Sequence, residues 1–320
     1  MLRKKYLTKV QSFVPITDYL RRYPLYNSYQ TMIEISNEKL TVVVNPQGAE
    51  LQSIVRKDTG LEYLWSGDPA FWGKKSPVLF PIVGGLKDNT YRYNGQSYTL
   101  GRHGFAREQL FTVTAQGTEH VSLRLSDNKN TRDVYPFHFN FTIQYLLQDD
   151  QLQVTYQVEN KDEKTLPFSV GAHPAFKLPL VANTTYEDYF LYFNKEETTG
   201  IWPLSPGGQI EMAPVPLLQH THELPLKKSL FYQDALVFKT LASTAISIKS
   251  KLTSHGLTLA FEGFPYMGIW AAKDADFVCI EPWCGIADNV AATGELEEKE
   301  GINRLAPGEL FERTWTATLF

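Results

Sequence analysis

The sequence predicts an all-β protein built mostly of antiparallel strands, and three observations lead to that class. Apolar and polar residues alternate in many short segments, as in residues 152–158. Turn signals separate these segments about every ten residues, the clearest being Asn94-Gly95. Helical periodicity is scarce, and we expect only short helical turns near residues 69–72 and 288–296. In a chain of 320 residues these features favour a large antiparallel sandwich over a barrel.

The expected strands follow one another along the chain. Residues 40–45 are a β-branched run that ends in a turn cluster. Residues 91–93 and 96–98 flank the Asn-Gly turn, whose two residues both tolerate positive φ, so we expect a hairpin there. Residues 277–280 are uniformly apolar, as in a buried strand. The other expected strands cover residues 121–125, 137–141, 152–158, 165–171, 235–238, 246–248 and 257–261. No linker or repeat divides residues 32–320, so we assign them to one domain.

Composition excludes several classes of function. The chain is 43% hydrophobic and 13% aromatic, which is enough for a large core. Its net charge is −4, and no basic field points to a nucleic-acid partner. No apolar run approaches the length of a membrane span, so we expect no membrane partner. Cys279 and Cys284 match no common zinc pattern, and we expect reduced thiols in a cytoplasmic protein.

The first 31 residues differ from the rest of the chain. They carry six basic residues and one acid, a net charge of +5 that leaves −9 for residues 32–320. The segment lacks the apolar region of a secretory signal and has no clear amphipathic helix. We interpret residues 1–31 as a basic N-terminal extension, and its origin, in the native chain or in an upstream start, is left open.

Two histidines follow expected strands, where a cleft can use them. His173 comes directly after the strand over residues 165–171. His103 follows the hairpin and is flanked by Gly101 and Gly104, which permit close approach of a ligand or another strand. Imidazole exchanges a proton near neutral pH, so each is a candidate acid or base. A structural histidine in a turn is the alternative for each.

Three further residues are candidates for a polar cleft. Glu281 follows a buried strand, where a carboxylate must be paired or solvated, and partial burial would raise its pKa toward that of a useful base. Backbone amides that satisfy the carboxylate are the alternative. Trp283 offers a flat face of the kind on which sugars stack. Asp234 precedes an apolar strand and is either a binding residue or a turn former.

Other histidines are expected to lie on the surface. His138 alternates with phenylalanines in an expected strand, on its polar face. His220 and His222 form a His-x-His pair that could ligate a metal, but no third ligand stands at a fitting distance. We therefore expect no metal site and an ordinary loop around this pair.

Six motifs occur in a characteristic order between Met32 and residues 305–309. They are residues 77–84 (PVLFPIVG), 102–107 (RHGFAR), 135–137 (YPF), 170–176 (VGAHPAF), 234–238 (DALVF) and 280–283 (IEPW). In these motifs the sequence resembles the aldose 1-epimerase (galactose mutarotase) superfamily, and it looks most like the LacX-like branch. The resemblance implies a galactose mutarotase-like β-supersandwich with an open cleft for a free sugar.

The resemblance also implies roles for the candidates. Glu281 takes the proton of the C1 hydroxyl, and His173 gives a proton to the ring oxygen, so that the ring opens. His103 hydrogen-bonds the ring oxygen or a neighbouring hydroxyl, and Asp234 accepts from sugar hydroxyls. This chemistry requires neither a metal nor an organic cofactor.

One position departs from the family pattern. Relatives commonly have an Arg after the Pro-Ile-Val-Gly string, where this chain has Gly85. We expect Lys87, Lys74, Lys75 or Arg102 to compensate for the lost bidentate donor. We also expect Gly85→Arg to tighten the binding of a simple hexose.

The leading hypothesis is an isomerase that interconverts the α and β anomers of a hexose. A rival is a hexose-6-phosphate 1-epimerase, in which Arg102 and Arg107, with Lys74 and Lys75, bind the phosphate. A third reading is a non-catalytic carbohydrate-binding module on the same fold. In each case the expected partner is a small-molecule sugar, and we expect a monomer or a weak homodimer.

Overall fold

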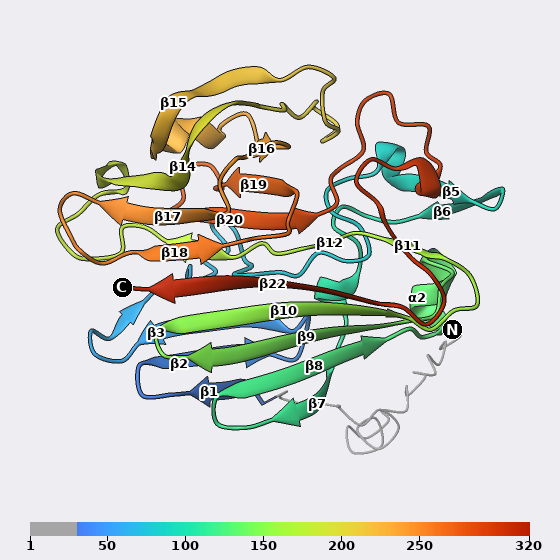
Figure 1. Cartoon of the computed structure of the whole chain (residues 1–320), viewed down its shortest axis with the longest axis horizontal. Coiled ribbons are helices and arrows are strands. Elements are labelled where there is room, and N and C mark those ends of the chain that lie inside the picture. Colours follow the sequence, from blue (N-terminus) through green and yellow to red (C-terminus); the bar gives the residue numbers. More distant parts are fainter. Residues whose placement is uncertain (1–30) are drawn as a thin grey trace, which may run out of the picture. The chain divides into compact units, whose positions relative to one another are not determined.

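The computed structural model describes residues 31–320, and strands dominate this part of the chain (Figure 1). The basic extension expected at the N-terminus lies outside the described residues. The long ladders are antiparallel, which confirms the predicted all-β class. In residues 31–320 no helix has the length and apolar composition that a bilayer span requires.

The strands and helices are as follows. The strands are β1 (Ile33–Ser36), β2 (Leu40–Asn45), β3 (Glu50–Arg56), β4 (Leu61–Glu62), β5 (Thr90–Tyr93), β6 (Gln96–Thr99), β7 (Thr112–Gln116), β8 (His120–Ser126), β9 (Phe139–Gln148), β10 (Gln151–Asn160), β11 (Leu166–Phe168), β12 (Val170–Gly171), β13 (Ala175–Lys177), β14 (Tyr189–Ile201), β15 (Val215–Pro225), β16 (Leu236–Phe238), β17 (Ala245–Ser250), β18 (Leu257–Ala260), β19 (Tyr266–Trp270), β20 (Phe277–Cys284), β21 (Asn303–Leu305) and β22 (Leu310–Leu319). The helices are α2 (Lys129–Val134) and the 3₁₀ turns η1 (Lys87–Asn89), η2 (Ala106–Glu108), η3 (Tyr186–Asp188), η4 (Lys228–Phe231) and η5 (Leu296–Glu298).

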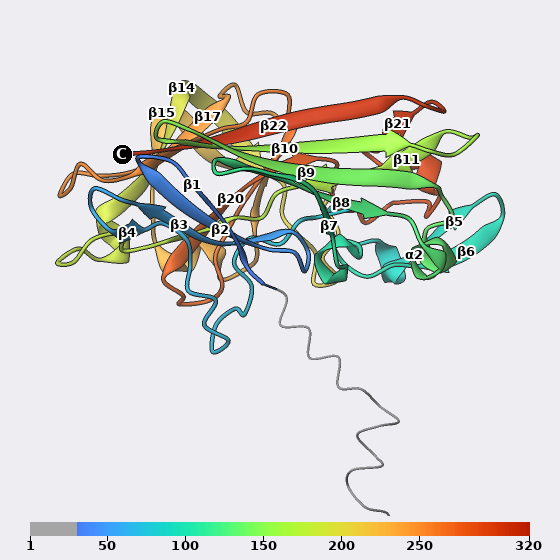
Figure 2. The ribbon, with the colours of Figure 1, turned by 90° about the horizontal axis from the view of Figure 1, so that it is seen from below.

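The strands form layered sheets. The largest sheet has nine strands in the order β15-β14-β17-β18-β22-β10-β9-β8-β7. A four-stranded sheet, β1-β2-β3-β4, lies behind β9 and β10 in Figure 1 and forms a separate layer beneath them in Figure 2. The hydroxyl of Tyr145 on β9 donates to the carbonyl of Ala49, beside β3, at 2.6 Å, and this bond ties the two layers together.

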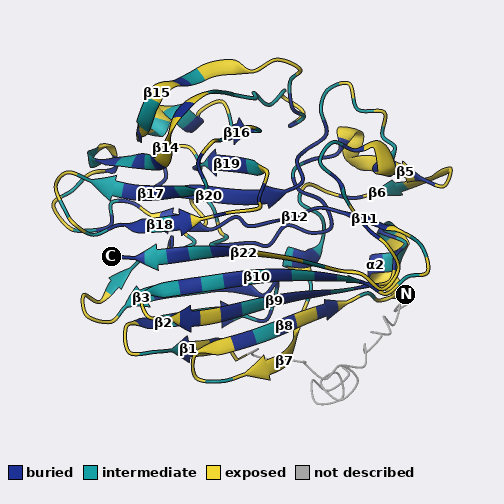
Figure 3. Ribbon diagram, viewed as in Figure 1, coloured by how far each residue is buried: buried dark blue, intermediate teal, exposed yellow. Residues whose placement is uncertain are grey.

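Alternation along each strand produces the core between these layers. On β10 the buried residues are Leu152, Val154, Tyr156 and Val158, and the residues between them are partly exposed. The same banding is visible along β9 and β10 in Figure 3. Burial of each such side chain stabilises the fold by about 1.5–3 kcal/mol. The alternation of apolar and polar residues in the sequence therefore identifies correctly which side chains of β10 face the core.

The local predictions hold in part. The Asn94-Gly95 turn connects β5 and β6, with φ of 49° and 73°, as the hairpin signal predicted. The segment over residues 69–72 is a turn closed by the amide of Trp72 on the carbonyl of Asp68, not a helix. Of residues 288–296, only Leu296 enters a helical turn, the start of η5.

Helix α2 was not predicted. It has six residues and no apolar period, so its signal lies in its cap. The side chain of Asn128 accepts from the amides of Asn130 and Thr131, and the Thr131 hydroxyl accepts from the amide of Asn128. This capping box satisfies amides that the first turn of a helix leaves free.

A smaller sheet positions the candidate site. Its order is β12-β20-β19-β16, and β13 also pairs with β20. Every residue of β20 is buried, and the strand is dark blue along its length in Figure 3. This sheet therefore carries polar side chains such as Glu281 into a dry environment, where they must find partners or a ligand.

Candidate active site

His173 and Glu281 face each other because two short strands pair with one long strand. β12 sets Gly171 opposite Trp283, and β13 continues the same register on β20 after a short gap. Extending this register across the gap sets His173 opposite Glu281. Residues directly opposed on antiparallel strands have Cβ atoms about 4.5–5.5 Å apart. Glu281 thus lies inside β20, not at the end of a strand as the sequence had suggested.

The two side chains are in contact and nearly dry. Nε2 of His173 is 3.4 Å from Oε2 of Glu281, with side chains 10% and 2% exposed. The ring of Trp72 stacks on His173 with centroids 4.9 Å apart, and Trp270 presents its edge at 5.6 Å. Nδ1 of His173 is buried without a hydrogen-bond partner. The aromatic rings thus fix the imidazole, and its Nε2 faces Glu281.

Burial moves the pKa values of the pair in opposite directions. Desolvation raises the pKa of Glu281 well above its usual range; the nearby indole of Trp283 opposes this shift, and the charge of Asp234 adds to it. Desolvation also lowers the pKa of His173 to about 3, with a smaller contribution from Arg107. Both shifts favour the uncharged form of each group, with the proton on the carboxyl group and a neutral imidazole.

His103 stands beside this pair as a hydrogen-bond donor. Its amide donates to the carbonyl of Gly84 at 2.8 Å, and the amide of Gly84 donates to Nδ1 of His103 at 3.1 Å. Because Nδ1 accepts, Nε2 carries the proton of the neutral ring. Desolvation and then the neighbouring His173 lower the pKa of His103 well below its usual value, so the ring stays neutral. Its centroid is 5.8 Å from that of His173.

Trp283 lies flat over two glycines. A Cβ on Gly171, its cross-strand partner, would be 2.6 Å from Cδ1 of the indole. A Cβ on Gly268, on the neighbouring strand β19, would overlap the other end of the same ring. The indole Nε1 is buried without a hydrogen-bond partner. Side chains at either glycine would therefore displace the ring that lines the cleft.

A cleft of about 470 Å³ opens over the pair. Its volume falls within the about 300–1,000 Å³ typical of small-molecule sites. Its lining combines flat aromatic faces with a few polar groups of both signs. The lining includes Trp72, Phe231, Tyr232, Trp270 and Trp283, the acids Asp234 and Glu281, and the bases Arg102, His103, Arg107 and His173. Aromatic faces with scattered polar groups suit a ligand with both apolar faces and hydroxyls.

Arg102 occupies the space beside Gly85. A Cβ on Gly85 would lie 3.9 Å from Nε of Arg102, and the guanidinium also packs on Gly208. Arg107 lines the cleft next to it, and its Nη2 donates to the carbonyl of Arg102 at 3.0 Å. A guanidinium therefore lies next to Gly85, but it belongs to Arg102 on a different loop.

The three lysines considered as substitutes do not reach the cleft. Nζ of Lys87 donates to the carbonyl of Val290 at 3.4 Å, and Lys87 is not among the residues that line the cleft. Lys74 pairs with Glu108 at 3.4 Å, and Nζ of Lys75 donates to the carbonyl of Gln52 at 2.8 Å. Contrary to expectation, the structure places Lys87 outside the cleft, with its amine turned to a neighbouring loop.

Asp234 lies in a bend beside the cleft. Its Oδ1 accepts from the amide of Ala235, the next residue, at 2.7 Å. The residue also lines the cleft, and its φ of 151° is unusual for a residue with a side chain. Strained backbone of this kind costs about 1–3 kcal/mol and clusters at ligand sites.

Several lining residues were missed from the sequence. Trp72 and Trp270 flank His173, yet one lies in a turn and the other ends a strand with no polar neighbour to mark it. Tyr232 and Gly208 come from connecting segments that reach the cleft only in three dimensions. An aromatic residue in a turn-rich segment, as at Trp72, was the one usable signal.

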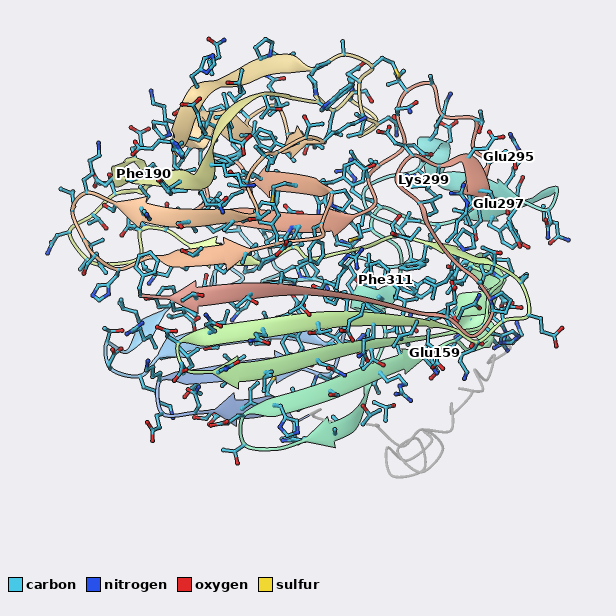
Figure 4. All side chains as sticks on the ribbon, in the orientation of Figure 1. Glu159, Phe190, Glu295, Glu297, Lys299 and Phe311 are labelled. Atoms are coloured by element: carbon cyan, nitrogen blue, oxygen red, sulfur yellow. The ribbon has the colours of Figure 1, made fainter. Side chains whose placement is uncertain are left out.

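A buried ion pair anchors the loop that holds His103. Nζ of Lys299 is 2.8 Å from Oδ1 of Asp288, with side chains 2% and 5% exposed. The other carboxylate oxygen of Asp288 accepts from the amide of Lys87, and the amide of Asp288 donates to the carbonyl of Gly85. Figure 4 labels Lys299 next to Glu295 and Glu297, around η5. The pair thus fixes the backbone around Gly85 from outside the cleft.

The remaining histidines lie away from the cleft. Nδ1 of His138 contacts Asp127 at 3.0 Å on the surface. His220 contacts Glu196, and His222 contacts the carbonyl of Phe193, so the two rings have separate partners. Within residues 31–320 neither joins a group of three potential metal ligands.

The fold is the galactose mutarotase-like β-sandwich, and its cleft contains an imidazole–carboxylate pair. The sequence model of the family described as aldose 1-epimerase matches residues 31–313. The chain belongs to this family. The chromosomal and plasmid forms of protein LacX from Lactococcus lactis subsp. lactis are each 34% identical to it over 296 residues, which cover 90% of this chain and 99% of LacX. These relatives support the LacX-like branch.

Solved structures agree with this assignment. A galactose mutarotase related enzyme from Lactobacillus acidophilus superposes with a TM-score of 0.87 at 36% identity, covering 91% of this chain and 97% of its own. A galactose mutarotase-like protein from Lactobacillus casei gives a TM-score of 0.84 at 30% identity, covering 91% of this chain and 100% of its own. A galactose 1-epimerase from Lactobacillus acidophilus shares the fold at 16% identity, with a TM-score of 0.68.

Proposed function

We propose that the protein interconverts the α and β anomers of a hexose by acid–base opening and closure of the sugar ring. The observation that carries the proposal is the contact of 3.4 Å between His173 and Glu281 in a cleft with aromatic walls. Two groups that exchange protons at neighbouring atoms are what a cyclic hemiacetal needs. Membership of the aldose 1-epimerase family supports the same chemistry.

In the proposed reaction, Glu281 as carboxylate removes the proton from the C1 hydroxyl. His173 as imidazolium gives its proton to the ring oxygen, the bond from C1 to that oxygen breaks, and C1 becomes an aldehyde carbon. Rotation about the C1–C2 bond exposes the other face, and the same two proton transfers in reverse close the ring. The proton transfers themselves require neither a metal nor an organic cofactor.

The directions of the two pKa shifts fit this cycle. A neutral pair with the proton on Glu281, the form that both shifts favour, holds the same number of protons as the ion pair that starts ring opening. A proton shift across the 3.4 Å contact converts one form into the other. Hydroxyls of a bound sugar would favour the ion pair by donating to the carboxylate. The enzyme then needs no proton from the solvent in order to begin.

Other lining residues would hold the sugar. Nε2 of His103 carries a proton and would donate to the ring oxygen or a neighbouring hydroxyl. Asp234 would accept from hydroxyls, and Arg102 would donate from its guanidinium. The unpartnered Nε1 of Trp283 would gain an acceptor, while its ring supports an apolar sugar face.

The test is anomer exchange measured by NMR on a panel of hexoses and hexose phosphates. We expect Glu281→Gln and His173→Asn each to lower kcat/KM by about 10²–10⁴-fold, the range typical of general acid–base groups. The matched control is His220→Asn, an exposed histidine away from the cleft, which should keep wild-type activity. Exchange no faster in wild type than in Glu281→Gln would disprove the catalytic proposal, and binding without exchange would favour a carbohydrate-binding module.

A second candidate is a hexose-6-phosphate 1-epimerase. It is favoured by the two guanidinium groups, Arg102 and Arg107, that line the same cleft, and by the buried Nε of Arg107, which has no hydrogen-bond partner. Paired guanidinium groups bind phosphate through charge-assisted hydrogen bonds. Competitive inhibition by inorganic phosphate and a preference for phosphorylated hexoses would select this candidate. Equal rates on free hexoses in the presence and absence of phosphate would reject it.

A further inference from the structure

A buried thiol lies next to the proposed catalytic pair. The Sγ of Cys279, an imidazole nitrogen of His173 and a carboxylate oxygen of Glu281 all lie within 4.8 Å of one another. Within the described residues this is the only group of three potential metal ligands of these types. The proposed ring opening gives Cys279 no task, so the juxtaposition requires its own account.

Strand geometry creates this cluster. Cys279 is two residues before Glu281 on β20, so both side chains project from the same face of the strand. The cross-strand partner of Cys279 is Ala175, whose methyl group leaves space in front of the thiol. The side chain of His173, two residues from Ala175, fills that space from the other strand.

The spacing of the ligand atoms is close to that of a tetrahedral zinc site. Zinc binds imidazole nitrogen and carboxylate oxygen at about 2.0–2.2 Å, which sets two such atoms about 3.3–3.5 Å apart at tetrahedral angles. Nε2 of His173 and Oε2 of Glu281 are 3.4 Å apart without any ion. The Sγ of Cys279 lies within 4.8 Å of both atoms and would have to move closer to complete the site.

Charge balance and coordination chemistry also fit a divalent cation. A thiolate, a carboxylate and a neutral imidazole together cancel two positive charges, which limits the penalty of burying the ion. Soft sulfur combined with nitrogen selects zinc or cobalt over magnesium or calcium. His173 and Glu281 line the cleft, so the fourth coordination position would face the space where a sugar binds. Nδ1 of His173 has no partner to orient it, so the site should bind less tightly than a dedicated zinc site.

We propose that His173, Cys279 and Glu281 form a site for a thiophilic divalent cation such as Zn²⁺, and that the bound ion inhibits the enzyme. The ion would occupy the lone pair of Nε2 and the carboxylate oxygen, so neither group could exchange a proton with a sugar. Ion binding rests on the cluster alone, whereas inhibition also rests on the proposed anomer exchange.

Binding is tested with Co²⁺ added to the full chain after removal of trace metals. We expect the thiolate-to-cobalt charge-transfer absorption in the near ultraviolet in wild type and its loss in Cys279→Ala. The matched control is Cys284→Ala, since this thiol is also buried on β20 but projects from the opposite face, with Sγ 3.7 Å from the carbonyl of Gly263. The band should persist in this control. Its absence from wild type, or its survival in a folded Cys279→Ala protein, would overturn the proposed site.

A second variant tests the site independently, in case Cys279→Ala does not fold. His173→Gln removes a different ligand and leaves the thiol in place. We expect its cobalt affinity to fall at least tenfold, with circular dichroism unchanged. An unchanged affinity in this variant would contradict the three-ligand site.

Inhibition is tested by anomer exchange at increasing Zn²⁺. We expect inhibition of wild type and Cys284→Ala, and at least tenfold weaker inhibition of Cys279→Ala, with each protein compared with its own activity without metal. Saturating sugar should weaken Zn²⁺ binding, since both occupy the same groups. Equal zinc sensitivity of Cys279→Ala and wild type would refute the thiol ligand. A cobalt band in a protein without anomer exchange would refute the proposed function and leave the metal site standing.

Discussion

At the residue scale, burial of Glu281 beside His173 affects the folding stability of the protein. Glu281 is 1% exposed, and burial raises the pKa of its carboxyl group well above its usual range. A carboxyl group with a raised pKa in the folded state keeps a proton that the unfolded chain releases. Folding stability from this group therefore falls as the pH rises from about 4.5 toward the raised pKa. Burial of the Glu281 carboxyl group thus costs the fold stability as the pH rises.

Glu281→Gln should stabilise the protein while removing its activity. The amide is similar in shape and has no titration, so we expect the free energy of unfolding to rise by about 2 kcal/mol at neutral pH. The gain should be larger at pH 8 than at pH 5, because the wild-type penalty grows with pH. Urea denaturation at the two pH values measures this difference. A gain that shrinks as the pH rises would contradict a raised pKa at Glu281.

Variants at Arg102 and Gly85 test whether Arg102 replaces the arginine that relatives have at the position of Gly85. Arg102→Ala should raise KM for the sugar about tenfold through loss of one bidentate donor. Adding Gly85→Arg to this variant should recover part of the loss, since a Cβ at Gly85 meets nothing closer than 3.9 Å. Gly85→Arg alone should help less, because two guanidinium groups would then share one space.

Polarimetric assays of the three variants measure these changes in KM. The matched control is Arg124→Ala, an exposed arginine on β8 that does not line the cleft. Unchanged KM in Arg102→Ala would show that this guanidinium does not contact the sugar.

At the scale of elements, the position of the Trp283 indole depends on glycines in the neighbouring strands, which leave room for the ring. Gly268→Ala should push the indole into the cleft, destabilise the protein by about 1–3 kcal/mol and raise KM. Gly101→Ala is the matched control, since nothing lies within 4 Å of its added Cβ and its φ is not positive. Denaturant titration and KM are the two readouts. Equal effects in the two variants would mean that close packing on Trp283 is unimportant.

Strand pairing also explains what the sequence could reveal about the site. The sequence identifies four candidates, because each stands beside a strand or turn with a clear pattern: His103, His173, Asp234 and Glu281. All four line one cleft. Their common location followed from the family resemblance, since no local pattern encodes which strands meet. The register of β12 and β13 on β20 is what sets His173 against Glu281.

Other contacts could not be read from sequence for the same reason. Lys87 and Arg102 were equivalent substitutes in sequence, as each offers a cation near Gly85. In the structure the amide of Lys87 binds Asp288 and its amine turns to Val290, while Arg102 lies across Gly208. The choice between them depends on loops that meet only after folding.

At the scale of the whole molecule, the buried site should isolate catalysis from ordinary changes in pH. The pKa of His173 is lowered to about 3, and that of Glu281 is raised well above its usual range. Both shifts favour a pair that holds a single proton, on Glu281. It gains a second proton only as the pH falls toward 3, and it loses its proton only above the raised pKa of Glu281.

The pH profile of kcat/KM should accordingly be flat from about pH 5 to pH 8, since kcat/KM reports groups of the free enzyme. Anomer exchange by NMR, corrected for the spontaneous rate in the same buffers, measures it. An inflection near pH 6.5, the ordinary pKa of histidine, would contradict a desolvated His173.

The shared register of β12 and β13 on β20 also determines which changes in length the family can accept. One residue added or removed between Gly171 and His173 would turn the imidazole to the other side of the sheet, because side chains alternate along a strand. The same change between Glu281 and Trp283 would misalign the carboxylate. A surface loop tolerates added or lost residues, but the length of these two segments is fixed by the strand register that sets His173 against Glu281.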